Sequence, residues 1–153
     1  MITIVLLDPK IPPNTGSTAR LCGAMNLKLD IVGEIGFDLS DSRLKRAGLD
    51  YWKHIDWEYH ENREAYLETL VEQRFHLLTT KAEKPYTQCE FEENDFLVFG
   101  SETSGIEESL LKKYWDNTCT IPMENPNIRS LNLATSVGIV VYEALRQTHA
   151  RSE

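Results

Sequence analysis

The sequence predicts an α/β domain with a mostly parallel β-sheet flanked by helices. Residues 2–7 (ITIVLL) form a nearly continuous apolar run rich in β-branched residues, which is typical of a parallel strand covered on both faces. Further short apolar runs alternate along the chain with segments of helical pattern. The 153 residues fit a single domain, residues 1–153, and contain no internal repeat or linker.

The elements are predicted in the following order. Further strands are expected at residues 29–32, 75–79, 96–99 and 118–121. Pro12 and Pro13 do not suit a helix interior, so the first helix is expected to begin after them. The predicted helices are one capped by Asn14 or Thr15, a short one capped by Ser40 or Asp41, one opened by Asn62, one over residues 106–114, and a long carboxy-terminal one capped by Ser130.

The apolar residues of the last helix occupy an arc of about 200° when they are placed at 100° per residue. One sheet does not cover so wide a face. The helix is therefore expected to pack on its own domain and on a second subunit. The alternative is a deeply buried helix of a monomer.

Composition narrows the class of protein. The fraction of charged residues is ordinary for a soluble protein, and no apolar run approaches the roughly 20 residues of a membrane-spanning helix. The net charge of −8 is unusual for a nucleic-acid binder, but residues 1–53 carry seven basic and six acidic side chains. This part of the chain is the expected place for phosphate contacts.

Cysteine and histidine positions point to a reducing environment and no metal. The three cysteines form no CxxC pair, so neither a disulfide framework nor a zinc site is predicted, and the cytoplasm is the expected location. The four histidines are scattered without the spacing of metal ligands.

Three short motifs follow predicted strands, where ligands bind in open α/β sheets. The first runs from Pro9 to Arg20. In it, Asn14 either belongs to a ligand-binding site or caps a helix, and Arg20 either contacts a phosphate or is an ordinary surface residue. The second, residues 99–105 (FGSETSG), lacks the Lys-Ser/Thr of a P-loop and carries Glu102. The third, residues 121–133 (IPMENPNIRSLNL), places Ser130 and Asn132 at a helix start, where capping alone would explain them.

Together these motifs resemble those of the SPOUT superfamily, SpoU branch. That family combines an N…R helix, an FGxExxG loop and an IPM…RSLNLxxSVxIxxYE segment, and all three occur here in order. The resemblance spans the whole chain and implies a carboxy-terminal trefoil knot, a homodimer and S-adenosylmethionine as cofactor. Members that share this minimal length, with no added RNA-binding domain, methylate the ribose 2′-oxygen of tRNA nucleotide 34, a cytidine or modified uridine.

The resemblance also assigns residues. It implies catalytic roles for Asn14, Arg20, Glu102 and Asn132, with Ser130 beside them. Cofactor contacts fall on five further positions, namely Leu78, Gly100, Ile121, Ser130 and Leu131. Independently of the resemblance, basic side chains are the candidates for contacts to the tRNA anticodon stem-loop, namely Lys10, Arg43, Lys45, Arg46 and Arg129. For the three on the short helix, a solvated helix face is the alternative. An arginine has a pKa above about 12, so Arg20 is expected to bind phosphate and stabilise the developing alkoxide rather than act as a base.

Two other functions remain open from the sequence. A ribosomal-RNA 2′-O-methyltransferase is one, although such members usually carry an extra RNA-binding domain. A non-catalytic nucleotide-binding module is the other, and the presence of Arg20, Glu102 and Asn132 speaks against it.

Overall fold

The computed structural model describes residues 1–152, apart from the side chains of residues 45, 47–50 and 150–152. In this part of the chain, six parallel strands form one sheet in the order β3-β2-β1-β5-β4-β6. The strands are β1 (Thr3–Leu7), β2 (Lys28–Val32), β3 (Asp56–His60), β4 (Phe75–Leu78), β5 (Phe96–Phe99) and β6 (Thr118–Cys119). The predicted α/β class is confirmed.

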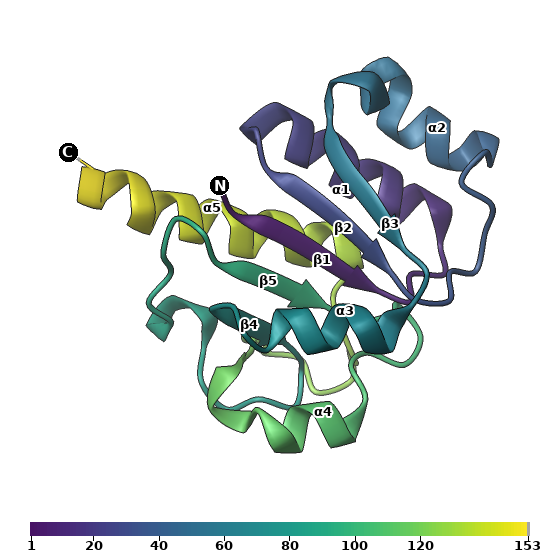
Figure 1. The fold of residues 1–153 in the computed structure, drawn as a ribbon. Helices are drawn as coiled ribbons and strands as arrows, with labels where there is room; N and C mark the ends of the chain where they lie inside the picture. Colours follow the sequence, from purple (N-terminus) through teal and green to yellow (C-terminus); the bar gives the residue numbers. More distant parts are fainter. Residues whose placement is uncertain (153) are drawn as a thin grey trace.

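Helices cover both faces of the sheet (Figure 1). The α-helices are α1 (Pro12–Met25), α2 (Ser42–Gly48), α3 (Arg63–Leu70), α4 (Glu108–Lys113) and α5 (Leu133–Ser152). Buried side chains of α1 and α5 pack on one face, and those of α3 and α4 pack on the other. Helix α2 packs on α1 rather than on the sheet.

Strand β1 lies in the middle of this arrangement. Its side chains alternate between two apolar clusters: Ile4 and Leu6 face the α1 and α5 side, while Val5 and Leu7 face the α3 and α4 side. All five residues of β1 are buried. The continuous apolar run at the start of the sequence is therefore explained by a strand covered on both faces.

Helix α1 begins at Pro12, three or four residues earlier than a cap at Asn14 or Thr15 predicts. Pro12 and Pro13 occupy its first turn, where an amide hydrogen has no partner within the helix and the fixed φ of proline suits the helix. Asn14 is therefore inside the helix and does not cap it. The N-cap residue is Ile11, whose side chain makes no capping hydrogen bond.

Helix α5 begins at Leu133, so the predicted cap at Ser130 is wrong. Asn132 is the cap, because its Oδ1 accepts a hydrogen bond of 3.1 Å from the backbone N–H of Thr135. Most of the apolar arc of α5 is buried within this chain, including Val137, Val140 and Ala144. Tyr142 remains 56% exposed.

Strand β3 was not predicted. Its sequence, DWEYH, contains no apolar run, and Trp57 and Glu58 are exposed. It is the last strand of the sheet on the β2 side, where a strand does not have to be apolar on both faces. Its pairing with β2, and not its own composition, makes this segment a strand.

Two further expectations concern the whole chain. Among the described residues, no helix is long and apolar enough to cross a membrane. The sheet order, with β6 beside β4 and α5 returning to the β1 side, is consistent with the knot that the resemblance implies, and the knot stays a prediction.

Candidate functional site

A cavity of about 520 Å³ lies beyond the carboxyl ends of β4, β5 and β6. All three motifs contribute to its walls, together with the segment that follows β4. The residues that line it on the second and third motifs include Gly100, Glu102, Ile121, Ser130, Leu131 and Asn132. Its volume is in the range of small-molecule sites.

The second motif forms a tightly closed loop directly after β5. The backbone N–H of Gly105 donates a hydrogen bond of 2.8 Å to the carbonyl of Ser101, and Gly105 adopts a left-handed φ of 67°. A Cβ on Gly100 would lie 2.2 Å from the carbonyl carbon of Gly105. Position 100 therefore accepts glycine alone, and the closed loop fixes where Glu102 points.

Glu102 binds the backbone that leads into helix α1 from another part of the chain. One carboxylate oxygen accepts the backbone N–H of Lys10 at 2.9 Å, and the other accepts that of Ile11 at 2.8 Å. A carboxylate at this end of a helix also interacts favourably with the helix dipole. Glu102 thus fixes the two residues that precede α1 and joins the second motif to the first.

Asn14 and Asn132 extend this contact to the third motif. Asn14 donates to Glu102 at 3.2 Å and accepts from the side chain of Asn132 at 3.0 Å. Since Oδ1 of Asn132 accepts from Thr135, the orientation of both amides is fixed by their partners. We call the side chains of Glu102, Asn14 and Asn132 the motif network. It joins three segments that are up to 118 residues apart in sequence.

The five positions expected to contact the cofactor all line the cavity. They are Leu78, Gly100, Ile121, Ser130 and Leu131. Sequence reasoning missed Thr79, Thr80 and Met123, which line it as well. Thr79 and Thr80 directly follow β4, so the rule that ligands bind beyond the carboxyl ends of parallel strands would have found them.

These walls suit S-adenosylmethionine, the cofactor that the resemblance implies. Apolar side chains such as Leu78 and Ile121 offer surface for an adenine ring, and hydroxyl groups such as that of Ser130 offer partners for ribose. Lys81 and Arg129 are the cations on the walls, and the carboxylate of Glu102 already accepts three hydrogen bonds. Either cation can pair with the carboxylate of S-adenosylmethionine.

Arg20 does not lie in this cavity. It is six residues after Asn14, which places it about 120° around the helix from Asn14. The side chain is exposed, and its guanidinium carbon lies 5.5 Å from the centre of the Tyr51 ring. The structure therefore separates Arg20 from the three other residues expected to act in catalysis.

The residues expected to contact RNA are dispersed. Lys10 donates to the backbone carbonyl of Glu34 at 2.6 Å, and Arg43 pairs with Asp41 at 3.1 Å. Arg46 is exposed on α2, and the side chain of Lys45 lies outside the described residues.

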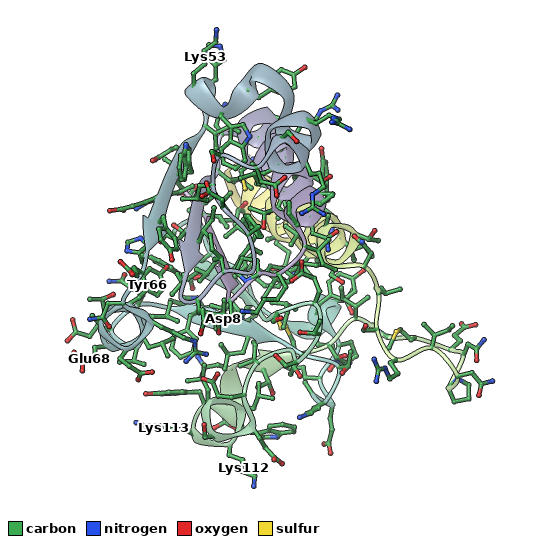
Figure 2. The ribbon with its side chains drawn as sticks, turned by 90° about the vertical axis from the view of Figure 1, so that its right-hand side faces the viewer. Asp8, Lys53, Tyr66, Glu68, Lys112 and Lys113 are labelled. Atoms are coloured by element: carbon green, nitrogen blue, oxygen red, sulfur yellow. The ribbon has the colours of Figure 1, made fainter. Side chains whose placement is uncertain are left out.

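Arg129 lines the cavity instead, on the loop between β6 and α5. Figure 2 shows part of this connection as a pale yellow-green segment that extends away from the body of the molecule. Arg129 is therefore placed at the cavity and not beside the other basic residues.

Comparisons with known proteins agree with this geometry. The model of the SpoU rRNA Methylase family matches residues 1–142. A tRNA (cytidine(34)-2'-O)-methyltransferase of Methylovorus glucosotrophus is 43% identical, with 96% of each chain covered. The protein of that name from Escherichia coli K12 is 42% identical and covers 96% of this chain and 94% of its own.

A solved structure described as giving insight into the 2-OH methylation of C/U34 on tRNA is also similar. It superposes with a TM-score of 0.90 at 42% identity, covering 96% of this chain and 95% of its own. The residues matched by the family model include all three motifs. This chain belongs to the SpoU rRNA methylase family.

Proposed function

We propose that this protein transfers the methyl group of S-adenosylmethionine to the ribose 2′-oxygen of nucleotide 34, a cytidine or uridine, of tRNA. The main support is its likeness, at 42–43% identity over nearly the whole chain, to relatives named for that activity. The motif network adds a physical argument, because it holds the three motifs together at one cavity.

The reaction asks the protein mainly for positioning. When bound, S-adenosylmethionine supplies a methyl group that its sulfonium already activates. Holding the ribose hydroxyl in line with that group contributes up to about 7–11 kcal/mol. Among the described residues, Asn14 and Asn132 each use one amide hydrogen within the motif network. The second hydrogen of each is available for a ribose hydroxyl or a phosphate.

We place Arg20 at the active site of a second copy of the chain. It does not line the cavity of its own chain, yet it lies on α1, the helix that carries Asn14. Exposed apolar side chains on α5 and the preceding loop, Tyr142 at 56% and Ile128 at 52%, offer a surface for a homodimer. In such a dimer, Arg20 binds the phosphate next to the target ribose and stabilises the developing alkoxide.

Mixing two inactive variants tests this placement. In a heterodimer, the Arg20→Ala subunit has an intact cavity and the Asn132→Ala subunit supplies an intact Arg20 to it. Random mixing of the two variants should therefore restore about a quarter of the active sites that the wild type has. No recovery would mean that Arg20 acts within its own subunit or not at all.

Replacing Arg20 by lysine tests its chemical role. Loss of activity at all pH values would support bidentate binding of a phosphate, which lysine cannot provide. Near-full activity at raised pH would instead indicate that the residue acts as a base.

The RNA surface is proposed to include Lys10, Arg43, Lys45 and Arg46, with Arg129 near the cavity. Because the chain has a net charge of −8, binding of the anticodon stem-loop should be weak and should fall steeply with salt. An affinity that does not change with salt would contradict this surface. The proposed location is the cytoplasm, where the buried cysteines Cys22, Cys89 and Cys119 stay reduced.

The activity itself is tested by incubating the protein with labelled S-adenosylmethionine and, in separate reactions, bulk tRNA and ribosomal RNA, followed by mapping of the modified nucleotide. Label on the ribose of nucleotide 34 is expected, and none with the Asn132→Ala variant. Label on ribosomal RNA instead would favour the alternative substrate. No transfer to any RNA would indicate a non-catalytic nucleotide-binding module.

A further inference from the structure

Four ionisable side chains gather at the outer edge of the sheet, on strands that do not line the cavity. Lys28 and Asp30 come from β2, and Glu58 and His60 come from β3. The parallel register pairs Asp30 with Glu58, so alternate residues of both strands lie on the face covered by α3. We call these four residues the edge cluster.

Three atoms of the edge cluster surround one point. His60 Nε2 lies 3.4 Å from Asp30 Oδ1 and 3.4 Å from Glu58 Oε2. One atom from each of these three residues lies within 4.8 Å of the other two. Zinc binds nitrogen and oxygen ligands at about 2.0–2.1 Å, so two ligands of a tetrahedral zinc ion are about 3.3–3.4 Å apart. The two separations from His60 Nε2 match edges of such a tetrahedron, and the two carboxylate oxygens lie within 4.8 Å of each other.

Two of these atoms are buried without a hydrogen-bond partner. They are Oδ1 of Asp30, a residue only 2% exposed, and Nε2 of His60. A buried polar atom left in this state destabilises the fold unless something binds it. Both atoms point into the same space, since they lie 3.4 Å apart. A cation between them would satisfy both.

Tyr66 holds two of the three residues in place. Its hydroxyl donates to Oδ2 of Asp30 at 2.6 Å, so Oδ1 is the oxygen that faces His60 and Lys28. Its ring lies against that of His60, with the centres 4.6 Å apart. Figure 2 shows Tyr66 on α3, beside the strands. Such outer partners are what orient the ligands of a metal.

We propose that Asp30, Glu58 and His60 bind a divalent transition-metal ion, with zinc as the best fit, each through one atom. One imidazole and two carboxylates suit zinc better than calcium or magnesium, which prefer oxygen ligands alone. Glu58 is exposed, so water completes the fourth position. The ion joins β3, the outermost strand, to β2.

Lys28 competes with the metal ion for the same carboxylates. Its ammonium lies 3.6 Å from Asp30 Oδ1 and 3.5 Å from Glu58 Oε2. Burial alone would lower the pKa of Lys28, but the two carboxylates raise it above its ordinary value. The side chain is 32% exposed and starts at the first residue of β2, so it has room to turn outward into solvent. Zinc binding should therefore displace the ammonium, and removing it should tighten binding.

The experiment uses the full-length protein, first stripped of metal with a chelator. Calorimetric titration with zinc chloride should give one ion per chain, and the melting temperature should rise when zinc is present. The variants His60→Ala and Glu58→Gln should lose at least tenfold in affinity, while Lys28→Leu should gain several-fold. His149→Ala is the matched control, because His149 is exposed on α5, and it should bind as the wild type does.

A cobalt spectrum separates the edge cluster from the cysteines. Cobalt bound here should show tetrahedral d–d bands without a thiolate charge-transfer band. Three results would overturn the proposal. They are zinc binding that survives in His60→Ala, a thiolate band in the cobalt spectrum, and zinc binding by Lys28→Leu but not by the wild type. Methylation of tRNA by His60→Ala should equal that of the wild type, so the metal site and the proposed activity stand or fall separately.

Discussion

The motif network and the edge cluster are both polar and partly buried, but they differ in whether their polar atoms have hydrogen-bond partners. In the motif network, both oxygens of Glu102 are occupied and each asparagine is held by a partner on either side. In the edge cluster, Asp30 Oδ1 and His60 Nε2 have no hydrogen-bond partner. A satisfied network serves to fix positions, whereas an unsatisfied one is suited to bind something.

The variant Asn14→Asp should give the largest effect. It places a second carboxylate where the Asn14 amide now donates to Glu102 at 3.2 Å. Repulsion between the two charges should lower the free energy of unfolding at pH 7 by about 3 kcal/mol. Urea unfolding measures this loss, and methylation should fall with it.

The pH dependence of Asn14→Asp checks the cause. The neighbouring Glu102 raises the pKa of the new carboxyl in the folded state. At low pH this carboxyl is protonated and donates again, so the difference from the wild type should shrink as the pH falls. A difference that does not change with pH would argue against charge repulsion.

The variant Glu102→Gln should have the next largest effect. An amide has only one acceptor oxygen, so either Lys10 or Ile11 would face an N–H group instead of an oxygen. A loss of about 1–3 kcal/mol in the free energy of unfolding is expected. Glu108→Gln is the control, because the Glu108 side chain is 68% exposed and should change stability by less than about 0.5 kcal/mol.

Asn132→Ala should lower the free energy of unfolding by less than Glu102→Gln does. It removes the cap of α5 and the donor to Asn14, which should lower the free energy of unfolding by about 1–2 kcal/mol. Methyl transfer should fall further than stability, because the third motif loses its link to the first. Asn127→Ala, in the exposed loop before α5, serves as the control for stability. Equal activity of the two variants would show that the motif network is not needed for catalysis.

Asp30→Asn should have the smallest effect when zinc is absent. The amide oxygen can still accept from Tyr66, and the edge cluster loses one negative charge. The free energy of unfolding should change by less than about 1 kcal/mol. A loss as large as that of Asn14→Asp would contradict the contrast between the two sites. The stabilisation by zinc seen in the wild type should disappear in this variant.

Much of the fold was predictable because the sequence pattern of many segments agrees with the way those segments are buried in the protein. β1 is apolar at almost every position, as burial on both faces requires, and Asn62 caps α3 as its side chain predicts. The wrongly predicted features have both local and remote causes. Pro12 and Pro13 lie in the first turn of α1 and Asn132 caps α5 in place of Ser130, while β3 is a strand because β2 pairs with it.

The sequence by itself determined the α/β class, the order of most elements and the three motifs that resemble the SpoU branch. Only the tertiary structure decided which side chains meet. Helical periodicity turns Arg20 away from the cavity that Asn14 enters. Strand pairing brings His60 to Asp30, although the histidines look scattered along the chain. Hydrogen bonds and ligand distances depend on contacts between remote segments, and spacing along one segment does not encode them.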